Sequence, residues 1–240
     1  MQRVMQAVPA HSETSNLVFI TLGCTAISDL STLQWLSAKG LSCRRGSEWL
    51  FKGLDVECQS GQLLWLRGSN GSGKTTLLRI LAGLSQADDG QLAYRTQDAG
   101  AVRKMLVYVG HTNGLKDDLS ALESLGFMAK LHGRPFDQEA LGLALRRLAI
   151  HHRRHAAVRT LSQGQRRRVA LSRLALEQEA GLWILDEPFD SLDAQGMDAI
   201  NGLLKEHLAR GGGVVMTSHV PLNLPQADVR QLELGTGTIR

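Results

Sequence analysis

Alternating apolar and polar residues predict the first strands of the chain. The pattern tightens from Leu41, with alternation at 49–51 and 54–58, and an apolar run at 62–67 follows a Ser60–Gly61 turn. Two strand-like runs on either side of a two-residue turn are typical of a β-hairpin. We therefore expect a hairpin that runs into a buried strand, with further short strands at 91–94 and 105–109.

Helical periodicity dominates the middle third of the chain. Residues 114–176 contain no strand-like run, and Leu119, Leu122 and Leu125 recur at a spacing that places them on one helix face. Ser120 and Glu123 match a capping box, which predicts the start of that helix. Strand patterns return at 182–186 and 213–217, with a helix between them. This order predicts an α/β fold whose sheet is interrupted by a helical insertion at about 114–176.

Residues 1–40 show no sustained period of either kind. We interpret them as an N-terminal extension, either disordered or produced by a start codon placed too early, and expect the folded domain to span 41–240. A signal or transit peptide is the alternative, although the basic flank is thin and no clean cleavage site stands out. The most apolar stretch, 17–27, is shorter than the about 20 residues that a membrane span needs.

The composition is that of an ordinary globular domain, with 43% hydrophobic, 21% charged and 5% aromatic residues over 240 positions. These values exclude collagen-like and wholly disordered chains. Cys24, Cys43 and Cys58 form no C-x-x-C pair, so neither a disulfide framework nor a zinc site is expected. A reducing compartment is the simplest interpretation. The net charge of +4 permits anionic partners without requiring them.

A glycine-rich segment between a strand and a helix predicts a nucleotide site. Residues 68–75 match G-x-x-x-x-G-K-[ST] without a mismatch, after the strand at 62–67 and before a helix expected to reach Leu84. The glycines let backbone N–H groups and the helix N-terminus face phosphates, and the lysine adds a mobile charge. The candidate phosphate-binding residues are Gly68, Ser69, Asn70, Gly71, Ser72, Gly73, Lys74, Thr75 and Thr76.

Two acidic residues at the end of a second strand supply the chemistry of phosphoryl transfer. The apolar run 182–185 ends in Asp186 and Glu187. We expect Asp186, together with the Thr75 hydroxyl, to hold Mg²⁺, and Glu187 to orient and deprotonate an attacking water. The pattern therefore favours ATP hydrolysis over passive nucleotide binding.

A third motif supplies a family resemblance. The segment 161–165, Leu-Ser-Gln-Gly-Gln, lies between the two motifs and resembles the signature sequence of ATP-binding cassette (ABC) ATPases. Ser162 is placed to N-cap the helix that follows, which would aim N–H groups at a phosphate. The resemblance covers 41–240 and implies a P-loop NTPase fold with a RecA-like mixed sheet, an antiparallel β subdomain and a helical subdomain.

The resemblance also implies how the site works. In this family two cassettes close head to tail, so that ATP lies between the phosphate loop of one and the signature of the other. It implies a homodimer of cassettes, ATP and Mg²⁺ as cofactors, a catalytic glutamate and a switch histidine. The residues that match the family's positions are Ser162, Gln163, Gly164 and Gln165 in the signature, Asp193 in the following loop, Glu187 as catalytic base and His219 as switch.

Two departures from the family pattern concern the same site. Most cassettes carry a glutamine after the strand that ends here at Val109, whereas this chain reads Gly110-His111-Thr112, so that His111 is the candidate for the metal and γ-phosphate contact. Most also carry an aromatic residue that stacks on adenine. Here Arg44 and Arg45 lie near that place, and Trp49 is an equal candidate.

The stretch 110–133 resembles the cassette subunit of the haem exporter that serves cytochrome c maturation. That resemblance implies an integral membrane permease of the CcmB kind as partner, indirect contact with haem-handling membrane proteins, and a peripheral position on the cytoplasmic face of the inner membrane. Another small exporter or a lipoprotein-release complex is the alternative within the class. In either case we expect the groove lined by 111–131 to receive the partner, with Leu119 and Phe127 as apolar anchors.

A soluble, nucleic-acid-associated cassette ATPase is the alternative of another class. The stretch 140–176 contains no acidic residue and many arginines, together with His151, His152 and His155, which is compatible with nucleic acid or a metal. No aromatic residue is interleaved for base stacking, and the chain has one cassette without a heptad run. We therefore expect no nucleic-acid partner and favour the transporter subunit.

Overall fold

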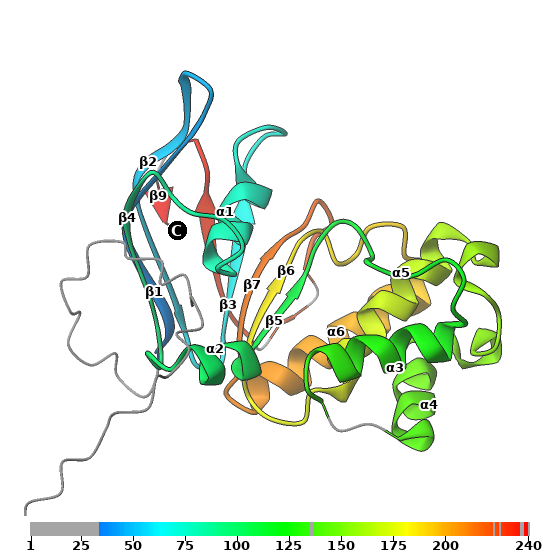
Figure 1. Ribbon diagram of the computed structural model, residues 1–240. Helices are drawn as coiled ribbons and strands as arrows, with labels where there is room; N and C mark the ends of the chain where they lie inside the picture. Colours follow the sequence, from blue (N-terminus) through cyan, green and yellow to red (C-terminus); the bar gives the residue numbers. More distant parts are fainter. Residues whose placement is uncertain (1–33, 135–136, 223, 226, 236–237, 240) are drawn as a thin grey trace, which may run out of the picture.

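The computed structural model describes residues 34–134, 137–222, 224–225, 227–235 and 238–239. Residues 1–33 of the extension expected at 1–40, with Cys24, lie outside these ranges. Two sheets and a group of helices make up the described part, as expected from the sequence (Figure 1). In that part no helix combines the length and the apolar character needed to cross a membrane.

A three-stranded antiparallel sheet forms one lobe, with the order β2-β1-β4. Its strands are β1 (Gln34–Arg45), β2 (Glu48–Gln59) and β4 (Asp89–Tyr94). Because β1 begins at Gln34, the folded domain includes at least seven residues before the boundary expected at Leu41, and that boundary was wrong. The cause is a regular strand whose residues 35–38 are all buried although their sequence does not alternate.

The tight hairpin of this lobe lies at Gly46–Ser47, not at Ser60–Gly61. Strand β2 pairs with β1 in antiparallel register, from Arg45 opposite Glu48 to Gln34 opposite Gln59. After the Ser60–Gly61 turn the chain leaves this sheet, because the Gly61 N–H donates to the carbonyl of Gly212, which directly precedes a strand of the other sheet. The expected hairpin between 54–58 and 62–67 was therefore wrong in its pairing, while both strands exist.

The second sheet has six strands in the order β5-β6-β7-β3-β8-β9. All neighbours run parallel except the final pair β8·β9. The strands are β3 (Gln62–Arg67), β5 (Leu106–Val109), β6 (Leu182–Leu185), β7 (Gly213–Thr217), β8 (Asp228–Glu233) and β9 (Thr238–Ile239). Parallel strands present their carboxyl ends at one edge, where ligands of open α/β sheets bind. The segments that follow β3, β5, β6 and β7 therefore meet at that edge.

Successive residues of the buried strands pack on opposite faces of this sheet. Trp183 and Leu185 face a core shared with the helical side, whereas Leu182 and Ile184 face a core shared with the antiparallel lobe. Helix α1 (Lys74–Leu81) fills the second core with Leu77, Leu78, Ile80 and Leu81, and it ends three residues before the expected Leu84. A short helix α2 (Ala99–Met105), which the sequence did not predict, precedes β5.

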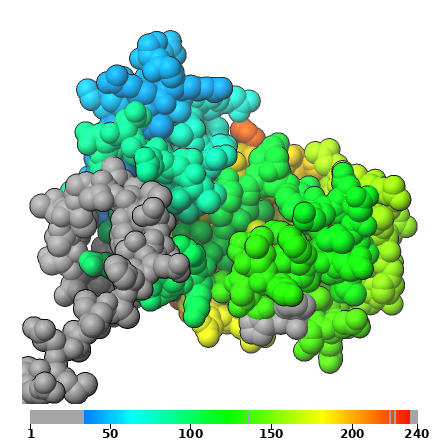
Figure 2. All heavy atoms as spheres, viewed as in Figure 1, coloured from blue at the N-terminus to red at the C-terminus, as the bar shows by residue number. Residues whose placement is uncertain are grey.

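The helical subdomain follows β5 and extends to about residue 176. It forms a separate bulge in the space-filling view (Figure 2). It contains α3 (Ala121–Leu131), α4 (Gln138–Arg147) and α5 (Gln163–Leu171), with 3₁₀ turns at His151–Arg153, Val158–Thr160 and Ser172–Leu176. The capping box of Ser120 and Glu123 is confirmed at the start of α3. Leu119 therefore precedes this helix instead of lying within it. Helix α6 (Ala194–Ala209) connects β6 to β7 as expected.

His207 is a fully buried histidine behind the catalytic edge. It stacks on Trp183 with ring centroids 3.8 Å apart, and its Nε2 lies 3.0 Å from the carbonyl oxygen of Gly181. Burial is the main cause that lowers the pKa of His207 to about 4, so the imidazole is neutral at physiological pH. The stack fixes α6 against β6, whose end carries the acidic pair.

Candidate active site

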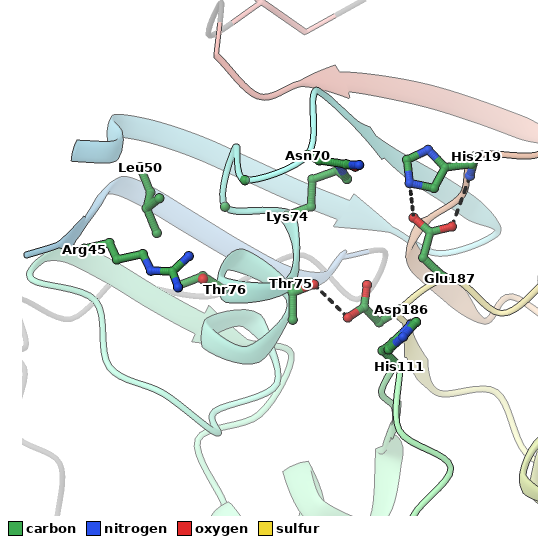
Figure 3. Close-up of a pocket in the computed structure, with 12 residues that line it drawn as sticks. Arg45, Leu50, Asn70, Lys74, Thr75, Thr76, His111, Asp186, Glu187 and His219 are labelled. Carbon is green, nitrogen blue, oxygen red and sulfur yellow. Dashed lines mark hydrogen bonds and ion pairs between the residues drawn. The ribbon is translucent and has the colours of Figure 1, made fainter. Parts of the chain in front are cut away.

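Four of the parallel strands, β3, β5, β6 and β7, are followed by residues that line one cavity of about 340 Å³. Figure 3 shows Lys74 and Thr75 of the phosphate loop facing Asp186, with His111 beside it and Glu187 next to His219. Arg45 and Leu50, which come from the antiparallel lobe, lie on the opposite side. The full lining is Arg45, Leu50, Asn70, Gly71, Gly73, Lys74, Thr75, Thr76, His111, Asp186, Glu187 and His219.

The phosphate loop is held by close backbone approach at its glycines. Gly68 has φ +140°, and a Cβ there would lie 2.8 Å from the carbonyl oxygen of Leu234, so only glycine fits without displacement. Gly73, at φ +93°, is the residue from which α1 starts. The Lys74 ammonium donates to the carbonyl oxygens of Gly68 and Ser69 at 2.8 and 3.0 Å. It therefore lies against the start of the phosphate loop.

Asp186 is buried and fixed by two hydroxyl groups. The Thr75 Oγ1 donates to one carboxylate oxygen at 2.9 Å, and the Thr217 Oγ1 donates to the other at 2.8 Å. Mg²⁺ prefers hard oxygen ligands and retains several waters, so a hydroxyl and a single carboxylate facing a phosphate site suit it. In the described part of the chain no group of three or more His, Cys, Asp or Glu side chains is arranged to hold a metal. Thr75 and Asp186 would thus hold the ion together with phosphate oxygens and water.

Glu187 sits on a strained backbone beside His219. Its φ is +48°, a conformation that non-glycine residues rarely adopt and that is typical of functional sites. The Glu187 N–H donates to Thr217 Oγ1 at 2.9 Å. The His219 N–H donates to the Glu187 carboxylate at 3.1 Å, and its Nε2 lies 3.6 Å from the other carboxylate oxygen. The side chain therefore lines the cavity with its carboxylate next to His219.

The signature residues do not reach this cavity within one chain. Ser162 begins α5, where its side chain accepts from the Gln165 N–H and the Gln165 side chain accepts from the Ser162 N–H, so the predicted N-cap is confirmed. Ser162 and Gln163 are exposed, and no signature residue lines the cavity. The helix N-terminus thus presents an anion-binding end to the outside.

Asp193 also lies apart from the cavity. Its carboxylate caps α6 by accepting from the Gly196 N–H at 2.8 Å, and it pairs with Arg168. The Gly196 hydrogen bond, followed by Arg168, lowers the pKa of Asp193. Its observed contacts are therefore those of a helix cap.

Of the three candidates for adenine contact, only Arg45 lines the cavity. The Arg44 guanidinium lies over the Trp49 ring, 3.9 Å from its centroid, and neither residue lines the cavity. Arg45 and Leu50 do line it. The sequence had singled out Arg45 but not Leu50, which is an ordinary alternating strand residue without a recognisable signal.

The structure also accounts for part of the basic stretch at 140–176. Arg167 and Arg168 are buried and donate to backbone carbonyls, while Arg147 pairs with Glu206 and Arg166 with Asp117. Sequence reasoning treated Arg167 only as one member of a charged run, because nothing in the spacing distinguishes it from its neighbours. Thr217 was likewise not predicted as a partner of Asp186.

Comparison with known proteins decides the family. The sequence profile described as "ABC transporter" matches residues 51–190, more than half of the chain. The chain belongs to the ABC transporter family. Among curated relatives of this ABC chain, the "Cytochrome c biogenesis ATP-binding export protein CcmA" of Nitrosomonas europaea is 42% identical over 208 residues, covering 85% of this chain and 97% of the relative. The protein of the same name from Methylococcus capsulatus is 44% identical over 203 residues, with 83% and 97% covered.

Solved structures of the ABC family agree in fold. A chain described as "Structure of ATP binding subunit of ABC transporter" superposes with a TM-score of 0.75 at 23% identity, covering 85% of this chain and 88% of that one. The ADP-bound cassette MJ1267 gives a TM-score of 0.67 at 21% identity, with 87% and 90% covered. These likenesses support the expected cassette fold, and an ABC cassette binds ATP.

Proposed function

We propose that the chain is the ATP-hydrolysing subunit of an ABC export complex of cytochrome c biogenesis. The observation that supports hydrolysis is the cavity itself, where Lys74, which follows β3, meets Asp186 and Glu187, which follow β6. The naming of relatives at 42% and 44% identity as CcmA supports the biogenesis role. On this proposal the complex handles haem or a haem-loaded chaperone, and its permease is a CcmB-like integral membrane protein.

The residues of this chain divide the work of hydrolysis. Lys74 and the loop N–H groups bind the β- and γ-phosphates, and Glu187 accepts the proton of the attacking water, held in place by the His219 N–H. Mg²⁺, held by Thr75 and Asp186, would neutralise phosphate charge. His111 also lines the cavity, which supports a contact with the γ-phosphate in place of the family's glutamine.

We further propose that two copies close head to tail around ATP. This arrangement is supported by the exposed capped N-terminus of α5, which carries Ser162 and Gly164 but lines no part of the cavity in its own chain. A second copy could then supply the missing donors to each nucleotide. The dimer would sit at the cytoplasmic face of the inner membrane as a peripheral component.

A second cavity is the proposed coupling surface for the permease. It measures about 330 Å³ and joins residues 108–114 of the β5 end and following loop to Met128 of α3 and Arg173. His111 lines both cavities, so movement at the phosphates can reach this surface. Of the two expected anchors, Phe127 is 44% exposed, whereas Leu119 is half-buried and its carbonyl accepts from the Val158 N–H. Phe127, which does not itself line the cavity but adjoins its lining residue Met128, is therefore the better candidate.

Replacing Phe127 with Asp is expected to break copurification with the permease while leaving a folded subunit. Loss of an aromatic anchor at an interface costs about 2 kcal/mol or more, which is roughly a 30-fold weaker association. Membranes containing tagged chain are solubilised, and the copurifying integral membrane protein is identified by mass spectrometry. Leu143→Asp, at an exposed residue of α4 away from the second cavity, is the control. Undiminished recovery of the permease by folded Phe127→Asp would contradict this coupling surface.

A further inference from the structure

Arg167 is a buried arginine that joins three segments at the catalytic edge. It lies on α5, five residues after Ser162, and is 3% exposed. Its Nη1 donates to the Gly110 carbonyl at 2.9 Å and to Asn113 Oδ1 at 3.2 Å. Its Nη2 donates to the carbonyls of Asp186 and Glu187, both at 2.8 Å. One guanidinium therefore holds the loop after β5 and the backbone of both acidic residues.

The chemistry of this site suits arginine and not lysine. A guanidinium presents five donors in a planar fork, whereas an ammonium is a point charge with three. Here the fork reaches four acceptors on two segments, the loop after β5 and the acidic pair after β6. Burial lowers the pKa of Arg167, and the nearby Asp190, Asp186 and Glu187 oppose that effect. A buried cation bound mainly to carbonyls carries a desolvation cost, so fold stability alone gives little reason to retain it.

The segment 187–191, whose first carbonyl accepts from Arg167, has a strained backbone at both ends. Glu187 has φ +48° and Ser191 has φ +59°. Such conformations cost about 1–3 kcal/mol each and persist only where surrounding contacts determine them. Helix α5 supplies those contacts, through Arg167 at the Glu187 carbonyl and through Gly164, where a Cβ would lie 2.5 Å from the Ser191 carbonyl oxygen. The signature helix thus clamps its own chain's catalytic turn.

We propose that Arg167 is a positioning residue that couples the signature helix to the catalytic glutamate of the same chain. It acts through the backbone of Glu187 and does not touch the nucleotide. The coupling between the two ATP sites, unlike the positioning of Glu187, rests on the proposed head-to-tail dimer. There, Ser162 contacts ATP held by the partner while Arg167, about 7–8 Å further along the helix, fixes the base for the chain's own ATP. Filling one site would therefore align the base of the other.

The test compares two Arg167 variants with a matched neighbour. Arg167→Lys keeps the charge but not the fork, and Arg167→Gln removes the charge. The control is Arg166→Gln, which removes bonds to the carbonyls of Val158, Arg159 and Leu161 that stay within the helical subdomain. ATPase rates are measured over a range of ATP concentrations, ATP affinity by fluorescent-nucleotide titration, and folding by circular dichroism and thermal melting.

We expect both Arg167 variants to fold, to keep ATP affinity within about threefold, and to lose about 10- to 100-fold in kcat, because displacing a reacting group by about 1 Å has effects of this size. The Hill coefficient for ATP should fall towards 1 in both, while Arg166→Gln keeps the wild-type kcat and Hill coefficient. The positioning role would be overturned by any of three results. Arg167→Lys could keep the wild-type kcat, Arg166→Gln could lose as much kcat as the Arg167 variants, or both Arg167 variants could fail to fold. A fall in kcat with cooperativity retained would overturn the coupling.

The outcome can be separated from failure of the proposed function. Positioning of Glu187 by Arg167 lies within one chain, so a kcat loss at unchanged ATP affinity supports it whatever the permease or cargo is. If wild-type chain hydrolyses no ATP even with its membrane partner present, the proposed function fails, and with it the reaction that Arg167 is proposed to serve. A wild type that turns over without any ATP-dependent dimer overturns only the coupling between sites.

Discussion

Glu187→Gln should lower ATP turnover by about 10²- to 10⁴-fold and leave ATP bound, because a positioned general base contributes a factor of this size. The amide keeps the shape and the hydrogen bond from the His219 N–H, but it cannot accept the proton of water. Asp186 and its two hydroxyl partners are unchanged, so the phosphate and metal contacts remain. The variant should therefore accumulate with intact nucleotide.

Size-exclusion chromatography with light scattering checks the second consequence of this substitution. With ATP and Mg²⁺ the Glu187→Gln chain is expected to run as a dimer, whereas the wild type returns to the monomer as it hydrolyses. Glu139→Gln, at an exposed position in the first turn of α4, is the matched control and should behave as wild type. A Glu187→Gln chain that hydrolyses at the wild-type rate would show that the base lies elsewhere.

Lys74→Ala should abolish tight ATP binding. The ammonium now donates to Gly68 and Ser69 of the loop, and it is the one loop side chain with a charge to offer the β- and γ-phosphates. Losing one partner of a desolvated charge pair costs about 2–5 kcal/mol, which is roughly 30- to several-thousand-fold in affinity. Turnover should be lost with it.

Isothermal titration with a slowly hydrolysed ATP analogue measures this loss directly, with circular dichroism to confirm folding. Lys205→Ala, which removes the same charge from the exposed face of α6, serves as control. If Lys74→Ala binds the ATP analogue with unchanged affinity, the phosphate loop is not part of the nucleotide site.

The sequence predicted those parts of the site whose geometry is local. A glycine-rich loop between a strand and a helix directs its N–H groups to the N-terminal end of that helix. Ser120 and Ser162 both cap the helices that their motifs predicted. The acidic pair and His219 follow apolar strands whose parallel pairing brings their ends together. Fold class and phosphate loop could therefore be predicted without coordinates.

Contacts between distant segments were beyond the sequence. The chain leaves the antiparallel sheet at Ser60–Gly61 because Gly61 binds Gly212, some 150 residues away, and no local pattern carries that information. The same holds for Arg167, whose acceptors lie 19 to 57 residues away along the chain. Strand β1 begins before its sequence alternates, since several successive residues are buried between layers.

Mixing two inactive variants tests the central claim most directly. Lys74→Ala disables the phosphate loop. Ser162→Arg removes the N-cap hydroxyl of α5 and places a bulky cation at the positive end of the helix dipole. If each ATP lies between the loop of one chain and the signature helix of the other, a mixed dimer has one site with both defects and one intact site. We expect each variant alone to be inactive and the mixture to recover measurable turnover. Random pairing makes half of the dimers mixed, each with one intact site, so the recovery is at most roughly a quarter of the wild-type rate, and it is lower to the extent that the empty site fails to align the base of the intact one. A mixture that forms mixed dimers yet stays as inactive as its parents would contradict the account.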